Sequence, residues 1–217
     1  MPKSKNSSEH WDSLWINRLT SFHLHLPGST EVEKLVRCQL YFKAIDRLLG
    51  SNLLEGKDIL ELGSGTGSNS LYLANTHKVK LVTLLDFSVN AFNRVATSSY
   101  PCQLIKIQTD IFNFYPQKSY DFVHSTGLIE HFYGEERFEV IKKHSDLCCT
   151  GGLVMIWVPV FSPVFRYISK FNHRIGIQEL PFTRNELQSL CSQNKLEIIR
   201  TGETAFGALY GILCRKK

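Results

Sequence analysis

Three glycines at alternate positions follow a short, mainly apolar run with an acidic residue just before its end. Gly63, Gly65 and Gly67 come directly after the run 58–62, which contains Glu61. Glycine allows a tight turn and a close approach of the backbone to a ligand. A dinucleotide site has the spacing G-x-G-x-x-G, which the third glycine breaks, and a carboxylate at Glu61 would repel a pyrophosphate. The stretch therefore predicts a loop that binds a ligand carrying an ammonium group.

A second acidic residue closes the next apolar run. Asp86 follows residues 80–85, and the residues between the two runs, at about 67–76, have helical spacing. In a strand–helix–strand unit this places Asp86 beside the glycine loop, where its carboxylate can accept hydrogen bonds from both hydroxyls of a ribose. The predicted ligand is a nucleoside that carries an amino acid. The alternative interpretation is that the glycines form only a turn and that Asp86 caps the helix beginning near Ser88.

From about residue 57 to its C-terminus the chain resembles the class I S-adenosylmethionine-dependent methyltransferases, whose first motif is an acidic residue followed by G-x-G-x-G. The resemblance implies S-adenosylmethionine as cofactor and S-adenosylhomocysteine as product. It also implies that the segments after the first four strands hold the methionine part, the ribose, the adenine and the region of the sulfonium. The cofactor-binding residues carried over by position are Glu61, Gly63, Ser64, Gly65, Gly67, Asp86, Phe87, Asp110, Ile111 and Ser125. For Asp110 a cap of its own loop is an alternative role.

His131 is the first candidate for a general base. The resemblance places the substrate just past the fourth strand, and His131 follows that strand in the segment 127–131. Methyl transfer from a sulfonium requires an aligned acceptor and the exclusion of water, and an acceptor hydroxyl is helped by a base that titrates near neutrality. The alternative is a histidine at a helix start that makes one fixed hydrogen bond. His23 and His25 could reach the site from an N-terminal lid or lie on surface loops.

Glu130 and His131 are similar to the E-x-x-E-H segment by which some members of the family, including plant small-RNA methyltransferases, bind a divalent metal. Gly127 stands at the position of the first glutamate, so one ligand of that pattern is missing. Together with a distant His144 or His173, the two remaining ligands would form an incomplete site. We therefore expect no metal.

The substrate is expected to be a small, partly aromatic molecule, methylated on an oxygen or a nitrogen. Aromatic residues gather in two parts of the chain outside the nucleotide-binding core, the N-terminal segment with Trp11, Trp15 and Phe22 and an insert at about 161–182. Both should lie near the carboxyl ends of the strands, where open α/β sheets bind ligands. The alternative is that these side chains pack helices onto the sheet. The predicted substrate-binding residues are Trp15, Thr126, Phe161 and Arg166.

The arrangement of the predicted site residues requires an α/β fold with a Rossmann-like, doubly wound sheet of seven strands. Apolar runs alternate with helical stretches from residue 58 onward, which is typical of parallel strands joined by crossover helices. The last two runs are too close for a crossover helix and must pair antiparallel. We expect N-terminal helices over 1–50 as a lid and a methyltransferase domain over 51–217. The expected strands are 58–63, 80–86, 102–109, 120–126, 152–160, 196–203 and 207–214, and the expected helices of the domain are 67–76, 88–99, 135–148 and 183–194.

Composition narrows the class of protein. The 217 residues include 25 basic and 20 acidic ones, and 43% are hydrophobic, as in an ordinary globular domain. The net charge of +5 is spread along the chain, so a nucleic-acid-binding role is not expected. The cysteines form no C-x-x-C pair, and neither a signal peptide nor a long apolar segment is visible, so we expect reduced thiols in the cytoplasm and no membrane association.

Three other functions remain open from the sequence alone. An RNA or protein methyltransferase would need a wide groove with a basic rim. A nicotinamide-dependent oxidoreductase is disfavoured by Glu61 and by Ser68 after the third glycine. A non-catalytic module would bind the cofactor without methyl transfer. The sequence does not indicate the oligomeric state.

Overall fold

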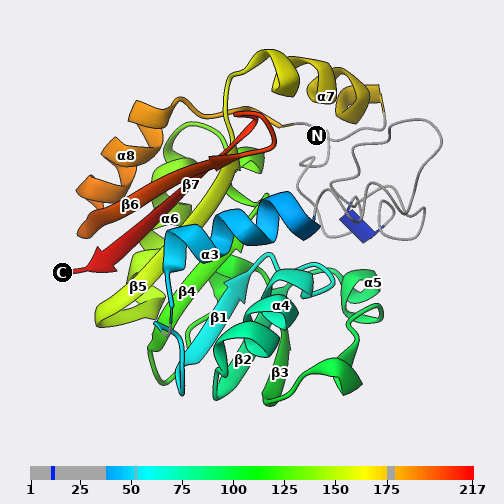
Figure 1. The fold of residues 1–217 in the computed structure, drawn as a ribbon, viewed down its shortest axis with the longest axis vertical. Helices are drawn as coiled ribbons and strands as arrows, with labels where there is room; N and C mark the ends of the chain where they lie inside the picture. The colour runs from blue at the N-terminus through cyan, green and yellow to red at the C-terminus, as the bar shows by residue number, and fades with distance from the viewer. Residues whose placement is uncertain (1–10, 13–37, 52, 175–178) are drawn as a thin grey trace.

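The computed structural model describes residues 11–12, 38–51, 53–174 and 179–217. At its centre lies one seven-stranded sheet with the strand order β3-β2-β1-β4-β5-β7-β6 (Figure 1). Strands β1 to β5 pair in parallel, and β7 is antiparallel to both β5 and β6. The strands are β1 (Asp58–Leu62), β2 (Leu81–Asp86), β3 (Gln103–Gln108), β4 (Tyr120–Thr126), β5 (Cys148–Pro159), β6 (Leu196–Thr204) and β7 (Leu209–Lys216). The predicted fold class and the antiparallel last pair are confirmed.

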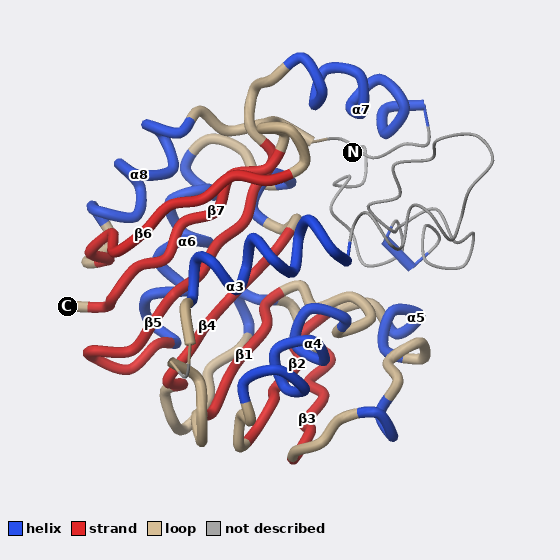
Figure 2. The backbone as a smooth tube through the Cα atoms, in the orientation of Figure 1, coloured by secondary structure: helices blue, strands red, loops and turns tan. Residues whose placement is uncertain are grey.

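Helices cover both faces of this sheet (Figure 2). Buried side chains of α3 and α4 pack on one face, and those of α6 and α8 on the other. Helix α7 lies beyond the carboxyl end of β5, at the top of Figure 1. The helices are α3 (Lys43–Leu49), α4 (Ser68–His77), α5 (Val89–Phe92), α6 (Glu135–Leu147), α7 (Pro163–Arg174) and α8 (Arg184–Gln193), with short turns η1 (Cys38–Phe42), η2 (Thr97–Ser99), η3 (Ile111–Asn113) and η4 (Ile129–His131).

The central strands are buried on both faces, which explains why they read as continuous apolar runs. Along β5 the side chains alternate between two hydrophobic clusters, because successive residues of a strand point to opposite faces. Ile156 packs with the α6 side, and Trp157, which is fully buried, packs with the α3 and α4 side. This arrangement holds the carboxyl ends of β1 and β4 rigidly next to each other, at the point where the strand order reverses. Open α/β sheets bind their ligands at such a point.

Helix α3 belongs to the core of the domain, although it falls in the predicted 1–50 segment. Ile45 and Leu49 are fully buried in the cluster that contains Trp157. Asp46 accepts a 2.5 Å hydrogen bond from the Tyr72 hydroxyl on α4. The last part of the N-terminal segment is therefore fixed to the sheet. The part that would form the predicted first helix lies outside the described residues except for positions 11 and 12.

The helix predicted over 88–99 was wrong. Ser88 does begin a helix, since its hydroxyl accepts a hydrogen bond from the Ala91 amide, but α5 ends at Phe92 and a separate turn, η2, follows. Residues 97–99 are Thr-Ser-Ser, which have low helix propensity, and Pro101 follows them closely. The capping box predicted at Thr183 and Glu186 is confirmed at the start of α8. Within the described part of the chain, no helix has the length and hydrophobicity needed to cross a bilayer.

Candidate active site

The glycine loop joins β1 to α4 in a backbone conformation that other residues rarely adopt. Gly63, Gly65 and Gly67 have φ angles of 61°, 53° and 69°. A Cβ atom on Gly67 would lie 2.6 Å from a methyl group of Leu84 and 2.6 Å from the hydroxyl oxygen of Tyr100. That hydroxyl donates a 2.6 Å hydrogen bond to the Gly67 carbonyl. The third glycine is therefore required both by its dihedral angle and by close packing.

Replacing Gly67 by Ala should lower the free energy of unfolding by about 2 to 5 kcal/mol, from the left-handed backbone and the steric overlap together. Gly56→Ala is a matched control, because Gly56 has the same φ of 69° but nothing within 4 Å of its Cβ position. In the control, the free energy of unfolding should fall only by the cost of the left-handed backbone conformation, about 1 to 2 kcal/mol. Chemical denaturation of the two variants measures the difference. Equal losses would show that the close packing at Gly67 has no energetic effect.

Asp86 connects the end of β2 to the glycine loop. One carboxylate oxygen accepts a 2.7 Å hydrogen bond from the Gly65 amide, and the other accepts a 2.9 Å bond from the Ser88 amide. The side chain is only 6% exposed, and this burial, with the nearby charge of Asp12 as a smaller contribution, raises its pKa above the ordinary value. Asp86 therefore lies beside the loop, as predicted, and each of its oxygens keeps a further lone pair.

Glu61 lies beneath the same loop, inside β1. Its carboxylate accepts hydrogen bonds from the Asn69 side chain at 3.1 Å and from the Ser70 amide at 3.2 Å, and so it also ties the first turn of α4 to the sheet. Burial raises the pKa of Glu61 to about 7. A positive charge placed next to it would favour the ionised form.

Ser64 follows the first glycine of the loop. Its hydroxyl oxygen is buried and has no hydrogen-bond partner in the described part of the chain. An unpaired buried hydroxyl costs free energy, so a ligand that reaches the loop and bonds to it would recover that cost.

Three of the predicted residues near the carboxyl ends of β3 and β4 have hydrogen-bond partners within the protein. The carboxylate of Asp110 is exposed and accepts a 2.8 Å bond from the Phe112 amide as the cap of η3, whereas Ile111 is buried. The Ser125 hydroxyl is 2.8 Å from Nε2 of His144 on α6. The Thr126 hydroxyl is 2.6 Å from that of Tyr41, a contact with the N-terminal segment that sequence reasoning missed.

His131 lies in η4, directly after β4, and is 7% exposed. The indole of Trp11 meets its ring edge to face, with 4.7 Å between the ring centroids and 74° between the planes. The neighbouring Asp12 accepts hydrogen bonds from the Ser88 hydroxyl and, at 3.2 Å, from the Asn90 amide. Two described residues of the N-terminal segment thus lie against the turns that follow β2 and β4.

The predicted substrate-binding residues are less closely grouped. Thr126 lies at the end of β4, but Phe161 is 60% exposed and Arg166, on α7, is also exposed. Trp15 lies outside the described residues. The structure therefore gathers the glycine loop, Asp86 and His131 at one edge of the sheet, and leaves Phe161 and Arg166 on its outer surface.

Comparison of the sequence with protein families gives one assignment. A family model described as a methyltransferase domain matches residues 33–200, most of the chain. The chain belongs to this family. The match includes α3, the glycine loop and Asp86, and it extends to β6. The protein is therefore an enzyme that transfers a methyl group.

Solved structures similar to the methyltransferase show the same fold. Magnesium protoporphyrin IX methyltransferase from Synechocystis PCC 6803, crystallised with S-adenosylhomocysteine, has a TM-score of 0.75 at 18% identity, covering 97% of this chain and 98% of that one. The N-methyltransferase NodS from Bradyrhizobium japonicum, also with S-adenosylhomocysteine, has a TM-score of 0.63 at 14% identity, with coverages of 94% and 97%.

A third similar structure is a putative methyltransferase of Haloferax volcanii in complex with the activator Trm112. It has a TM-score of 0.69 at 13% identity, and the match covers 84% of this chain and 92% of that one. A comparison with curated proteins found no match.

Two buried histidines of the methyltransferase lie near the site but are unsuited to acid–base work. His124 on β4 is 3.1 Å from the Ser70 hydroxyl, and His144 bonds to Ser125. Burial lowers the pKa of His124 to about 3 and that of His144 to about 4. Both rings are therefore neutral at physiological pH and connect β4 to the helices on its two faces.

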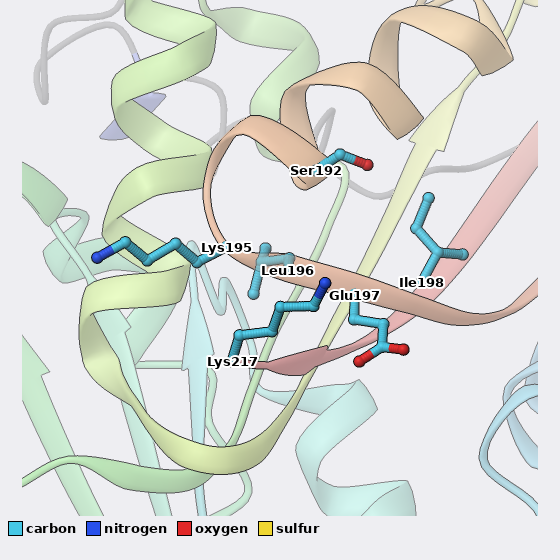
Figure 3. Close-up of a pocket in the computed structure, with 6 residues that line it drawn as sticks. All are labelled: Ser192, Lys195, Leu196, Glu197, Ile198 and Lys217. Atoms are coloured by element: carbon cyan, nitrogen blue, oxygen red, sulfur yellow. The ribbon is translucent and has the colours of Figure 1, made fainter.

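A shallow hollow elsewhere on the methyltransferase lies far from this chemistry (Figure 3). It is lined by the end of α8, the turn that follows it, the first residues of β6 and Lys217. Because β7 is antiparallel to β5, the end of β7 lies at the edge of the sheet opposite the glycine loop. We assign no role in methyl transfer to this hollow.

Proposed function

We propose that this methyltransferase takes its methyl group from S-adenosylmethionine and transfers it to an oxygen or nitrogen of a small, partly aromatic molecule. One observation carries the cofactor assignment. Glu61 lies below the glycine loop and Asp86 lies beside it, hydrogen-bonded to Gly65 at 2.7 Å. Two carboxylates at this loop suit a ligand with an ammonium group and a ribose, and disfavour a pyrophosphate.

The residues present fit the cofactor. The buried Ser64 hydroxyl lacks a partner in the described part of the chain, and the glycines of the loop place no side chain between the backbone and a ligand. In this proposal Glu61 attracts the ammonium group, Asp86 accepts from the ribose hydroxyls, and Phe87 and Ile111 flank the adenine. Two similar structures crystallised with S-adenosylhomocysteine support the choice of cofactor. The bound sulfonium supplies an electrophilic methyl group.

The protein's own contribution is to orient the acceptor, to exclude water and to accept the proton that the acceptor loses. His131 is our candidate for the base, with an imidazole nitrogen that takes the proton of an acceptor hydroxyl. Trp11 against His131 supports the proposal that residues 1–50 include a lid over this side of the site. Turnover of an identified acceptor by His131→Ala tests the base. A rate comparable to that of the wild-type enzyme would leave His131 a structural residue.

The acceptor class rests on the same geometry. His131 is nearly buried and packs against the indole of Trp11, surroundings that suit a small molecule with an apolar part better than a polymer. Two proteins of similar structure, a magnesium protoporphyrin IX methyltransferase and the N-methyltransferase NodS, agree with this class. Free thiols at the five cysteines of positions 102–214 support a reducing compartment, and we propose the cytoplasm.

Isothermal titration with S-adenosylhomocysteine and with NAD tests the cofactor assignment. We expect micromolar binding of S-adenosylhomocysteine and no binding of NAD. The glycines lack the G-x-G-x-x-G spacing of a pyrophosphate-binding loop, and the carboxylates of Glu61 and Asp86 next to the loop would repel a pyrophosphate. Tight binding of NAD with no binding of S-adenosylhomocysteine would overturn the proposal.

A further inference from the structure

Three side chains that can bind a metal ion meet next to the turn after β4. A carboxylate oxygen of Glu130, a ring nitrogen of His131 and a carboxylate oxygen of Glu179 all lie within 4.8 Å of one another. Neighbouring ligands of one small divalent ion lie roughly 3.0 to 3.6 Å apart, because each bond is about 2.0 to 2.2 Å long. The three atoms, none more than 4.8 Å from another, must therefore draw together by side-chain rotation when an ion binds.

Glu130 provides the second, independent observation. Its side chain is fully buried, and neither carboxylate oxygen has a hydrogen-bond partner in the described part of the chain. A buried carboxyl group without a partner is costly, since it gives up hydration and gains nothing in return. A cation held between Glu130 and its two neighbours would remove that cost.

The scaffold around these ligands is rigid. The backbone amide of Leu180 donates a 3.0 Å hydrogen bond to the Glu130 carbonyl, so the segment after position 178 is joined to η4. The buried guanidinium of Arg137 donates to the Phe132 carbonyl at 3.0 Å and to the Leu180 carbonyl, and it pairs with Glu186 at 2.5 Å. Arg137 thus fastens both ligand-bearing segments and directs its own hydrogen bonds away from the Glu130 carboxylate.

We propose that Glu130, His131 and Glu179 form a binding site for one divalent transition-metal ion on the acceptor side of the active site. Two carboxylates balance the charge of such an ion, and carboxylate with imidazole suits Mn²⁺ or Zn²⁺. Water or an acceptor oxygen would complete the coordination. The site does not depend on S-adenosylmethionine being the methyl donor, because the ion can be bound without it.

This proposal revises the expectation of no metal, which considered Glu130 and His131 together with a distant His144 or His173 but did not consider Glu179. Gly127 does leave the first position of that motif empty. The third ligand comes instead from Glu179, about fifty residues later in the chain. An occupied site would make His131 a ligand in place of the base, and the ion would then lower the pKa of a bound hydroxyl.

Titration of the metal-free, full-length protein with MnCl₂, followed by electron paramagnetic resonance and calorimetry, tests the site. We expect one Mn²⁺ per chain, and at least a tenfold weaker affinity in Glu179→Gln and in Glu130→Gln. Glu197→Gln is the matched control, because Glu197 is exposed at the opposite edge of the sheet. Its affinity should equal that of the wild-type protein.

Glu179→Gln keeps the test decisive if Glu130→Gln fails to fold, because Glu179 is only partly buried. Competition with ZnCl₂ should displace the bound Mn²⁺ from the same site. Absence of binding of both ions at 100 μM, or Mn²⁺ binding that Glu179→Gln leaves unchanged, would overturn the proposal. Either result would leave the cofactor titration with S-adenosylhomocysteine unaffected, so the two proposals fail separately.

Discussion

Replacing Glu61 by Gln is expected to weaken cofactor binding and, in the same protein, to stabilise the empty enzyme. The pKa of Glu61 is about 7 in the empty site, against an ordinary value of 4.5, because burial disfavours its charge. The stability that the protonated carboxyl supplies at low pH is therefore lost as the pH rises from 4.5 to about 7. Above that pH the loss reaches about 3 kcal/mol, at 1.36 kcal/mol per pKa unit. Glu61→Gln should recover most of this.

Ionisation of Glu61 destabilises the empty enzyme but should strengthen cofactor binding, so the affinity should rise over the same pH range in which the stability falls. An ammonium group binds best to the ionised carboxylate, so the affinity of the wild-type enzyme for S-adenosylhomocysteine should fall by up to tenfold per pH unit below pH 7. Burial also raises the pKa of Asp86, so protonation of Asp86 should add to the loss of affinity at low pH. In Glu61→Gln this pH dependence should be shallower, and the affinity at pH 7.5 should be lower by about 10- to 150-fold, as expected for a charge-assisted contact of about 1.5 to 3 kcal/mol.

Calorimetric titrations between pH 5.5 and 8, together with urea unfolding of the empty protein, measure both effects. Glu197→Gln removes an exposed carboxylate far from the loop and should change neither the affinity nor its pH dependence. Our placement of the ammonium group would be contradicted by a Glu61→Gln variant that binds S-adenosylhomocysteine as the wild type does.

Loss of the Asp86 carboxylate should weaken cofactor binding by about 1 to 3 kcal/mol, because the ribose hydroxyls lose their acceptors. This corresponds to roughly 5- to 150-fold in the dissociation constant. Asp86→Ala also leaves the Gly65 and Ser88 amides without their partner. Asp86→Asn is the cleaner variant, since its amide oxygen can still accept one of those bonds.

A double-mutant cycle separates the ribose contact from loop distortion. The affinity of wild-type and Asp86→Asn enzymes would be compared for S-adenosylhomocysteine and for its 2′,3′-dideoxy analogue. If Asp86 bonds to the ribose, removing the hydroxyls costs affinity in the wild type and much less in the variant. Equal costs in both proteins would place the ribose elsewhere.

The parts of the site that were predictable from the sequence are those fixed by local pattern. The glycine loop follows β1 and Asp86 ends β2 because parallel strands and their crossover helix leave few ways to arrange those residues. The capping box at Thr183 was equally local. Ser125 and Asp110 show the limit of such arguments. Their role in binding the cofactor stays a prediction. The cap that Asp110 makes for η3 was the alternative role given from the sequence, whereas the contact between the Ser125 hydroxyl and His144 depends on tertiary packing.

Contacts between distant segments were not predictable. Glu179 lies near Glu130 because Arg137 and the Leu180 amide join two segments that no periodicity connects. Trp11 reaches His131, and Tyr41 reaches Thr126, for the same reason. A single sequence shows which residue types are present, but it gives no distance between segments that are far apart along the chain. These are also the contacts that shape the acceptor side of the enzyme.

Because Trp11 packs against His131, its intrinsic fluorescence should report the binding of a molecule next to the imidazole. Indole fluorescence depends on the polarity and charge around the ring, and a molecule that reaches the imidazole from that side must displace or restack the indole. Trp157 is buried in the core and contributes a constant background emission. The third tryptophan, Trp15, is a predicted substrate-binding residue, so the signal of Trp11 has to be separated from that of Trp15. Candidate acceptors can therefore be screened without a label or a coupled assay, with Trp11→Phe as the blank.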